Sequence, residues 1–348
     1  MNKKLATKVS IPSLSLIALA MSSAAMADEK ASTFFEITAR VQSELVSVDG
    51  SAAEARNTDK WYITDGWGNG TNNSHNWSAV FLDGEHKFTN GVRLFVRHSY
   101  NFNMDGLNDG RGKYRESYVG VAGDFGMLRG GRLESPYKLN TLQWDPFVGS
   151  FLQARANGGK SGGPLGAGGY IDDAVDYTLV QNGITFRALY SNNDGQPAPA
   201  GVERDTMWAG SVNVPVGNVE LALAHFDAGN RGNGKRDGTK IGARTSLDQF
   251  TFAAEYEFRG TGLENADILF LSTTYNAEKR SYSLSYGEFM DNGIMNNDGE
   301  YFALGFKQTL NPRVMFHGGY RQTRRDLTGT EHIIGVGVRL IWRHRSDF

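Results

Sequence analysis

The residues with the clearest chemical role are arginines in segments where every second side chain is apolar. Alternate side chains of such a segment point to opposite faces, so the arginines share a polar face. They are Arg40, Arg93, Arg97, Arg115, Arg132, Arg187, Arg244, Arg321 and Arg339. Arg93, Arg97, Arg115 and Arg132 lie on consecutive segments and predict a basic wall. The glycine-rich stretch that follows offers acids to oppose this wall, namely Glu134, Asp145, Asp172 and Asp173. A basic wall facing acidic side chains predicts a transverse electric field across a water-filled constriction.

Catalytic and metal-binding patterns are weak in comparison. Gly159-Lys160-Ser161 resembles the end of a phosphate loop, but that pattern needs glycine where Ala154 stands and a helix where Gly162, Gly163 and Pro164 follow. The histidines show no pair at metal-ligand spacing, and no local signature marks a nucleophilic serine. Cysteine is absent, which excludes thiolate metal sites and thiol redox chemistry. We therefore expect no enzyme activity, no cofactor and no metal.

The first 27 residues predict a secretory signal peptide. Lys3, Lys4 and Lys8 precede a mostly apolar run over 11–20, and Ala25-Met26-Ala27 supplies the small residues of a cleavage site. The apolar run is too short for a membrane anchor, which needs about 20 residues. Cleavage leaves 33 basic and 38 acidic side chains, so nothing indicates nucleic acid as a partner.

Two-residue periodicity predicts sixteen strands in the rest of the chain, 28–348, and the clearest of them lack the 3.6-residue spacing of a helix. We place them at 35–43, 77–88, 92–101, 114–122, 127–133, 174–181, 184–192, 205–214, 219–226, 239–247, 250–258, 267–275, 281–289, 299–310, 314–322 and 332–348. Short turns alternate with long polar connections at 44–76, 101–113, 227–238 and 290–297. This asymmetry is typical of outer-membrane barrels, and an even count lets the sheet close.

The last strand gives the most direct sign of a membrane wall. Ile334, Val336, Val338, Leu340 and Trp342 alternate with glycines and arginines, and the chain ends on Phe348. One face suits lipid and the other suits water. The fold class predicted is all-β, a 16-stranded antiparallel transmembrane β-barrel. The connection between Leu133 and Asp173 is far longer than usual loops, and we expect this third loop to fold into the lumen.

One central segment resembles a known family. The stretch from Arg115 to Arg132, RESYVGVAGDFGMLRGGR, resembles the strand, turn and strand of Gram-negative trimeric general porins, and DPFVG at 145–149 is similar to their constriction loop. The resemblance implies a homotrimer in outer-membrane lipid and lipopolysaccharide that passes ions and small hydrophilic solutes. It assigns constriction roles to Arg115, Arg132 and Asp145. The chain departs from the pattern at Asn76 to Ala79, where enterobacterial porins have another wall arginine, and ion preference stays open.

Two alternatives remain at this point. A solute-specific oligosaccharide channel would use an aromatic binding track, for which the candidates are Trp61, Tyr62, Trp67, Trp77, Tyr137, Trp144, Phe147 and Phe151. The same aromatics could instead pack the loops onto the barrel rim or form trimer contacts. A barrel-based enzyme or adhesin is the other alternative: an enzyme would have a lipid-facing or rim cluster of serine and histidine, and a plugged lumen would deny conductance.

Overall fold

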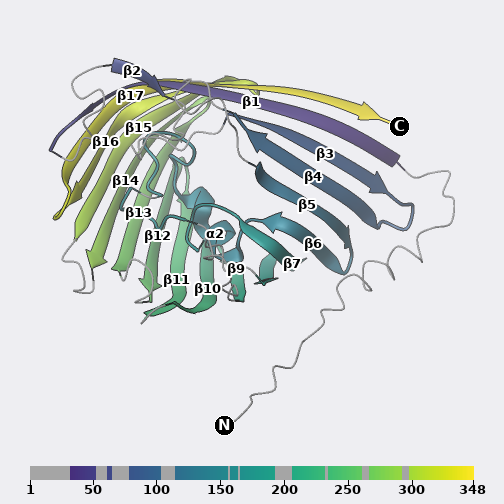
Figure 1. Ribbon diagram of the computed structural model, residues 1–348. Helices are drawn as coiled ribbons and strands as arrows, with labels where there is room; N and C mark the ends of the chain where they lie inside the picture. The colour runs from purple at the N-terminus through teal and green to yellow at the C-terminus, as the bar shows by residue number, and fades with distance from the viewer. Residues whose placement is uncertain are drawn as a thin grey trace, which may run out of the picture.

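The computed structural model describes residues 32–51, 61–64, 78–102, 114–155, 157–163, 165–192, 206–231, 234–260, 266–291 and 298–348. In these ranges the chain forms one antiparallel sheet that curls into a barrel (Figure 1). The connection between β6 and β7 carries the helical turns α2 and η1 and lies inside the ring of strands in that view.

Sixteen strands make the barrel and a short one, β2, extends it. Their bounds are β1 Ser32–Asp49, β2 Trp61–Thr64, β3 Ala79–Lys87, β4 Arg93–Asn101, β5 Tyr114–Gly123, β6 Gly126–Leu133, β7 Ile171–Gln181, β8 Ile184–Ser191, β9 Met207–Val216, β10 Val219–Arg231, β11 Gly234–Leu247, β12 Phe250–Arg259, β13 Ala266–Ala277, β14 Arg280–Asp291, β15 Gly299–Asn311, β16 Val314–Arg325 and β17 Gly329–Asp347. Between β6 and β7 lie α2, Pro136–Thr141, and η1, Leu142–Trp144.

The first strand closes the barrel. β1 pairs along one edge with β17, from Phe34 opposite Asp347 to Asp49 opposite His332. Along its other edge β1 pairs first with β3 and then with β2. Closure removes the free strand edges that hydrocarbon would leave without hydrogen bonds.

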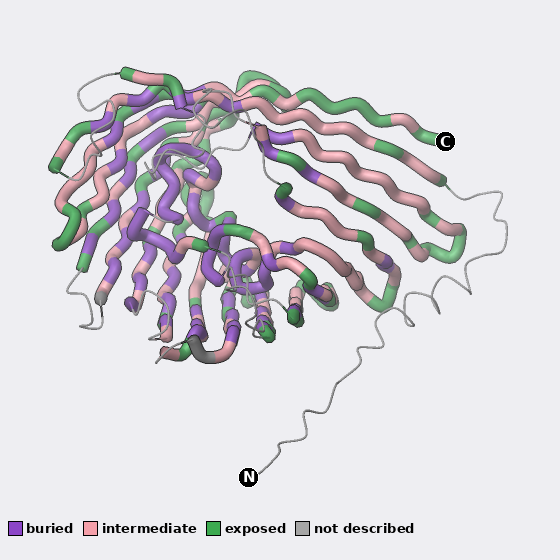
Figure 2. Tube along the Cα trace, viewed as in Figure 1, coloured by how far each residue is buried: buried purple, intermediate pink, exposed green. Residues whose placement is uncertain are grey.

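Burial follows the two-residue alternation. In β12 the side chains of Phe250, Phe252 and Phe258 are exposed, whereas Glu255 and Glu257 are buried. Figure 2 shows the same alternation along the strands, with the most continuous burial in the loop inside the barrel. The acids can be buried because the loop lies against them, and the phenylalanines are exposed because they cover the outer surface. The outer face therefore suits lipid and the inner face is polar.

The sixteen predicted strands are all present, although most run further than predicted. The predicted long connection at 227–238 is wrong: β10 continues to Arg231 and β11 starts at Gly234. These strand ends were not predicted because the apolar alternation stops at Asp227, where the register shifts, and the residues that follow are polar or glycine. β2 was not predicted, since it lies within the supposed connection 44–76.

The apolar core of the molecule lies at the contact between the third loop and the wall, not in a separate layer. Tyr137 of α2 packs with Phe226 and Ala224 of β10 in one cluster. Phe147 and Phe151 of the loop pack with Phe270 and Tyr301 of the wall in another. Among the described residues, no helix is both long and apolar enough to cross a membrane.

Candidate functional site: the constriction inside the barrel

The third loop, residues 134–170, is anchored on one side by two buried glutamates of β12. Glu255 accepts a hydrogen bond from Lys160 Nζ at 2.5 Å, and Lys240 Nζ lies 3.7 Å from its other oxygen. Glu257 accepts bonds from Ser161 Oγ at 2.6 Å and from the Tyr137 hydroxyl at 2.8 Å. Because these charges are paired and fully buried, breaking one pair is costly. They fix the loop to β11 and β12.

A second set of bonds fixes the middle of the loop to β1, β16 and β17. Gln42 Nε2 donates to the Gly149 carbonyl at 2.6 Å, and Arg321 Nη1 donates to the Phe151 carbonyl at 2.7 Å. Glu44 accepts from the Phe151 N–H at 3.2 Å and is 2.8 Å from His317 Nε2. The loop is thus held on the half of the wall that runs from β9 to β1.

The third loop begins with the capped helical turn α2. Ser135 Oγ caps α2 by accepting from the Lys138 N–H at 3.1 Å, and Pro136 sits at the first helical position. Lys138 Nζ forms an ion pair with Glu134 at 2.5 Å. Burial by itself would raise the pKa of Glu134, but the charge and hydrogen bond of Lys138 outweigh it and hold that pKa below its usual range. The carboxylate stays ionised beside the basic wall.

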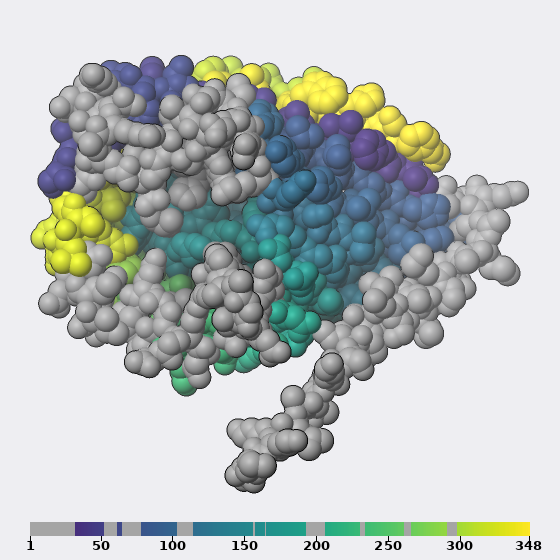
Figure 3. Space-filling view, in the orientation of Figure 1, coloured from purple at the N-terminus to yellow at the C-terminus, as the bar shows by residue number. Residues whose placement is uncertain are grey.

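The opposite half of the wall, β3 to β6, carries the predicted arginines; Arg93 and Arg97 are partly exposed, whereas Arg115 is buried beside the loop. Arg97 lies 2.6 Å from Asp83 and 3.5 Å from Glu116, and Arg93 lies 3.2 Å from Glu85. A depression of about 270 Å³ runs along this face, lined in part by Arg93 and Arg97. Figure 3 shows a hollow leading into the barrel to the left of the blue strands, with teal atoms inside it. The side chain of Arg97 is 35% exposed.

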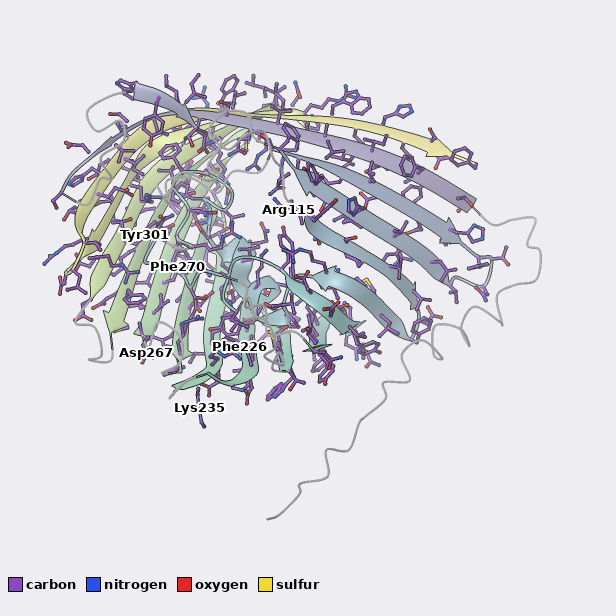
Figure 4. All side chains as sticks on the ribbon, in the orientation of Figure 1. Arg115, Phe226, Lys235, Asp267, Phe270 and Tyr301 are labelled. Atoms are coloured by element: carbon purple, nitrogen blue, oxygen red, sulfur yellow. The ribbon has the colours of Figure 1, made fainter. Side chains whose placement is uncertain are left out.

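Arg115, Arg132 and Lys138 meet at the ring of Tyr170, the described residue just before β7. The guanidinium carbons of Arg115 and Arg132 lie 5.4 and 5.3 Å from the ring centroid, and Lys138 Nζ lies 4.6 Å from it. Arg115 also donates to Asn101 at 3.2 Å, and Arg132 pairs with Asp172. Figure 4 shows Arg115 directed into the space between β5 and the loop. These cations gather where the loop leaves the wall.

The predicted acids occupy three different settings. Glu134 pairs with Lys138, and Asp172 with Arg132, so both lie beside cations. Asp145 is buried within the loop, where it accepts from the N–H groups of Phe147 and Ala154 at 2.8 Å each. Burial raises the pKa of Asp145, although both bonds oppose that rise. Asp173 has a φ of 49° at a strand irregularity. The structure thus brings Glu134 and Asp172 to the arginines and puts Asp145 elsewhere.

Sequence reasoning missed Arg129 because strict alternation puts it on the face opposite to Arg132. In the structure Arg129 binds Asp176, with Nε 3.0 Å from Oδ1, and its guanidinium lies over Tyr118. The ladder between β6 and β7 shifts register between Gly131 and Leu133, so Arg129 and Arg132 both reach inner groups. The pair Gly130-Gly131 was the available signal, since glycines within a strand often mark a bulge.

The aromatics of the third loop do not form an exposed track. Tyr137, Trp144, Phe147 and Phe151 are all buried against the wall, which leaves no ring face for a sugar. Trp61 is exposed on β2 and Tyr62 packs beside the cluster of Phe147 and Phe151. Trp67 and Trp77 lie outside the described residues. Within the described ranges, no group of three acids or histidines is arranged to hold a metal.

Comparisons with known proteins agree with this geometry. A family model described as Gram-negative porin matches residues 13–328. The anion-selective porin from Comamonas acidovorans aligns with a TM-score of 0.73 over 89% of this chain and 100% of its own, at 14% identity. A multiple mutant of the Rh. blastica porin aligns with a TM-score of 0.64 over 88% of this chain and 100% of its own, at 13% identity. The trimer form of OmpT from Vibrio cholerae aligns with a TM-score of 0.61 over 89% of this chain and 99% of its own, at 12% identity. No curated protein sequence matches the chain.

Proposed function

Since the chain belongs to the Gram-negative porin family, we propose that its constriction lies between the third loop and the arginines of β4 to β6, and that it prefers anions. The protein is an outer-membrane channel for the passive diffusion of small solutes. The proposal adds where a solute is selected and by which charge. It assigns that role to Arg93, Arg97, Arg115 and Arg132 on the wall, with Glu134 and Asp172 as their acidic neighbours.

The cluster around Tyr170 supports the proposal most directly. Cations meet there from β5, β6 and α2 at the margin of the loop. Arg40 of β1 lies close enough to Arg115 and Arg339 for their charges to interact. The acid predicted to oppose this wall, Asp145, is turned into the loop, where backbone N–H groups bind it. A narrow passage with surplus positive charge concentrates anions.

The reversal potential across a planar bilayer in a KCl gradient tests this function. We expect the wild-type channel to favour chloride, and Arg115→Ser, Arg132→Ser and their double variant to shift the reversal potential toward potassium. Arg313→Ser is the matched control, because Arg313 is exposed in the turn between β15 and β16. An unchanged reversal potential in the double variant, or an equal shift in the control, would retire the assignment.

The proposal extends to maturation, assembly and the lack of catalysis. Cleavage after Ala27 would release the signal, and mass spectrometry of the mature chain checks it. A homotrimer is supported by the trimer form of OmpT, which shares this fold at 12% identity; contact with lipopolysaccharide is expected from the outer-membrane location. Conductance in three equal steps is the expected result. Passive diffusion needs no catalytic group, and nothing specific favours the oligosaccharide-specific channel or a barrel enzyme.

A further inference from the structure

The wall under the third loop lacks side chains where the loop comes closest. Gly242 of β11, Gly287 of β14, Gly305 of β15 and Gly335 of β17 all face the loop from the inner surface. We call these residues the glycine seat. The seat occupies the half of the barrel across the lumen from Arg115, as Figure 4 shows for the neighbouring Tyr301 and Phe270.

The closest approach is at Gly287. A Cβ atom added there would overlap the Cα atom of Gly159, and its three nearest neighbours are all backbone atoms of Gly159. Backbone cannot rotate away as the end of a flexible side chain does. Non-bonded carbon atoms need about 3.5–4.0 Å, so an alanine at 287 must displace Gly159 by more than about 1 Å.

The other seat residues receive side chains of the loop. A Cβ atom at Gly242 would stand 2.5 Å from Cζ3 of Trp144, and one at Gly305 would stand 2.6 Å from Cδ1 of Leu152. A Cβ atom at Gly335 would stand 3.2 Å from Cζ of Phe151, but it would first meet Leu45 O and Val46 Cγ1 of β1, each at 2.7 Å. Four separate strands thus omit a side chain where the loop needs the space.

The loop has little freedom to slide along the wall. Ser272 Oγ donates to the Trp144 carbonyl at 2.8 Å, and the Tyr301 hydroxyl donates to the Leu152 carbonyl. Lys160 and Ser161, next to Gly159, are bound to Glu255 and Glu257. The barrel wall behind the seat is a hydrogen-bonded sheet. The displacement that remains is toward the lumen and the arginines.

We propose that the glycine seat sets the width of the constriction and therefore the size of solute that the channel admits. This inference rests on the proposed function, in which the gap between loop and arginines selects solutes. Each glycine lets the loop lie one side-chain layer closer to the wall. A side chain at Gly242, Gly287 or Gly305 narrows the gap without changing its charge.

Gly287→Ala and Gly287→Val test the proposal with the cleanest geometry. We expect single-channel conductance to fall stepwise from wild type to alanine to valine. In a liposome-swelling assay, the fold-loss of uptake should be larger for a disaccharide than for a monosaccharide. Gly130→Ala is the matched control, because a Cβ atom at this barrel glycine meets nothing within 4 Å. Wild-type conductance in both Gly287 variants would overturn the proposal.

A second pair of variants decides the matter should the Gly287 chains fail to fold. Gly242→Ala should lower conductance, and Gly242→Ala with Trp144→Phe should recover part of it, because phenylalanine lacks Cζ3 and Cη2, two of the three atoms that the new Cβ atom meets; the third is the Ala254 carbonyl oxygen. No recovery, or no loss in the single variant, contradicts the seat. Ion selectivity separates the test of the glycine seat from the test of the proposed function. Variants of the seat should change conductance and keep the wild-type reversal potential. The reversal potential of the arginine variants tests the proposed function alone.

Discussion

Gly131 decides, at the scale of single residues, how two arginines of β6 reach the lumen. Its φ is 141°, in the region that favours glycine, and a Cβ atom there would overlap the Ser117 carbonyl oxygen. We expect Gly131→Ala to destabilise the folded barrel by about 1–3 kcal/mol. The temperature at which the folded band is lost in electrophoresis measures this, with the adjacent Gly130→Ala as control. Equal losses in the two variants would show that the bulge does not require glycine.

The ion pair between Glu134 and Lys138 makes one contribution to stability depend on pH. The folded-state pKa of Glu134 lies below its usual value, so the pair stabilises the protein above the unfolded pKa of about 4.3 and is lost as pH falls through the folded value. We expect Glu134→Gln to cost roughly 1–3 kcal/mol at neutral pH. The difference in denaturation temperature between wild type and variant should shrink below about pH 4. A difference that stays constant from neutral to acid pH would contradict the assignment.

The third loop and β12 form the element on which the constriction depends. Glu255 pairs with both Lys160 and Lys240 within a fully buried site, so Glu255→Gln removes the carboxylate nearest to two buried ammonium groups. We expect a loss of about 3–5 kcal/mol and a noisier open-channel current as the loop loosens. Glu257→Gln is the matched comparison: an amide oxygen in place of Oε2 still accepts from the Ser161 and Tyr137 hydroxyls, while the charge beside Arg259 Nη1, 3.8 Å away, and the acceptor of the Ser161 N–H are lost. A larger cost for Glu257→Gln in chemical denaturation would reverse this ranking.

The same element shows what sequence can and cannot predict. Strands such as β12 can be predicted from alternation alone, because an apolar residue such as Phe252 belongs on the outer face and a charged residue such as Glu255 on the inner face. The bonds of Lys160 to Glu255 join residues 95 positions apart, and no local pattern encodes that pairing. Gly159-Lys160-Ser161 therefore read as a failed phosphate loop, although its lysine and serine anchor the loop. The position of Asp145 was equally hidden, since its partners are backbone N–H groups.

At the scale of the whole molecule, alternate side chains face lipid and water around a closed sheet. This arrangement explains why the chain carries so many charges and still forms a membrane wall. It also explains why the arginine wall lies across from the loop: the loop occupies the inner surface from β9 to β1, and the open path runs along β3 to β6. The lipid-facing phenylalanines and the inner glutamates of β12 both follow from this two-residue alternation.

The most direct test of this account is thiol accessibility along β5, which the natural absence of cysteine allows. Tyr118 lies on the inner face beside Arg129, whereas the neighbouring Val119 is exposed on the outer face. In planar bilayers, a water-soluble charged thiol reagent should reduce the current through Tyr118→Cys channels and leave Val119→Cys channels unchanged. Block at position 119, or no effect at position 118, would contradict the claim that this strand has one face on water and the other on lipid.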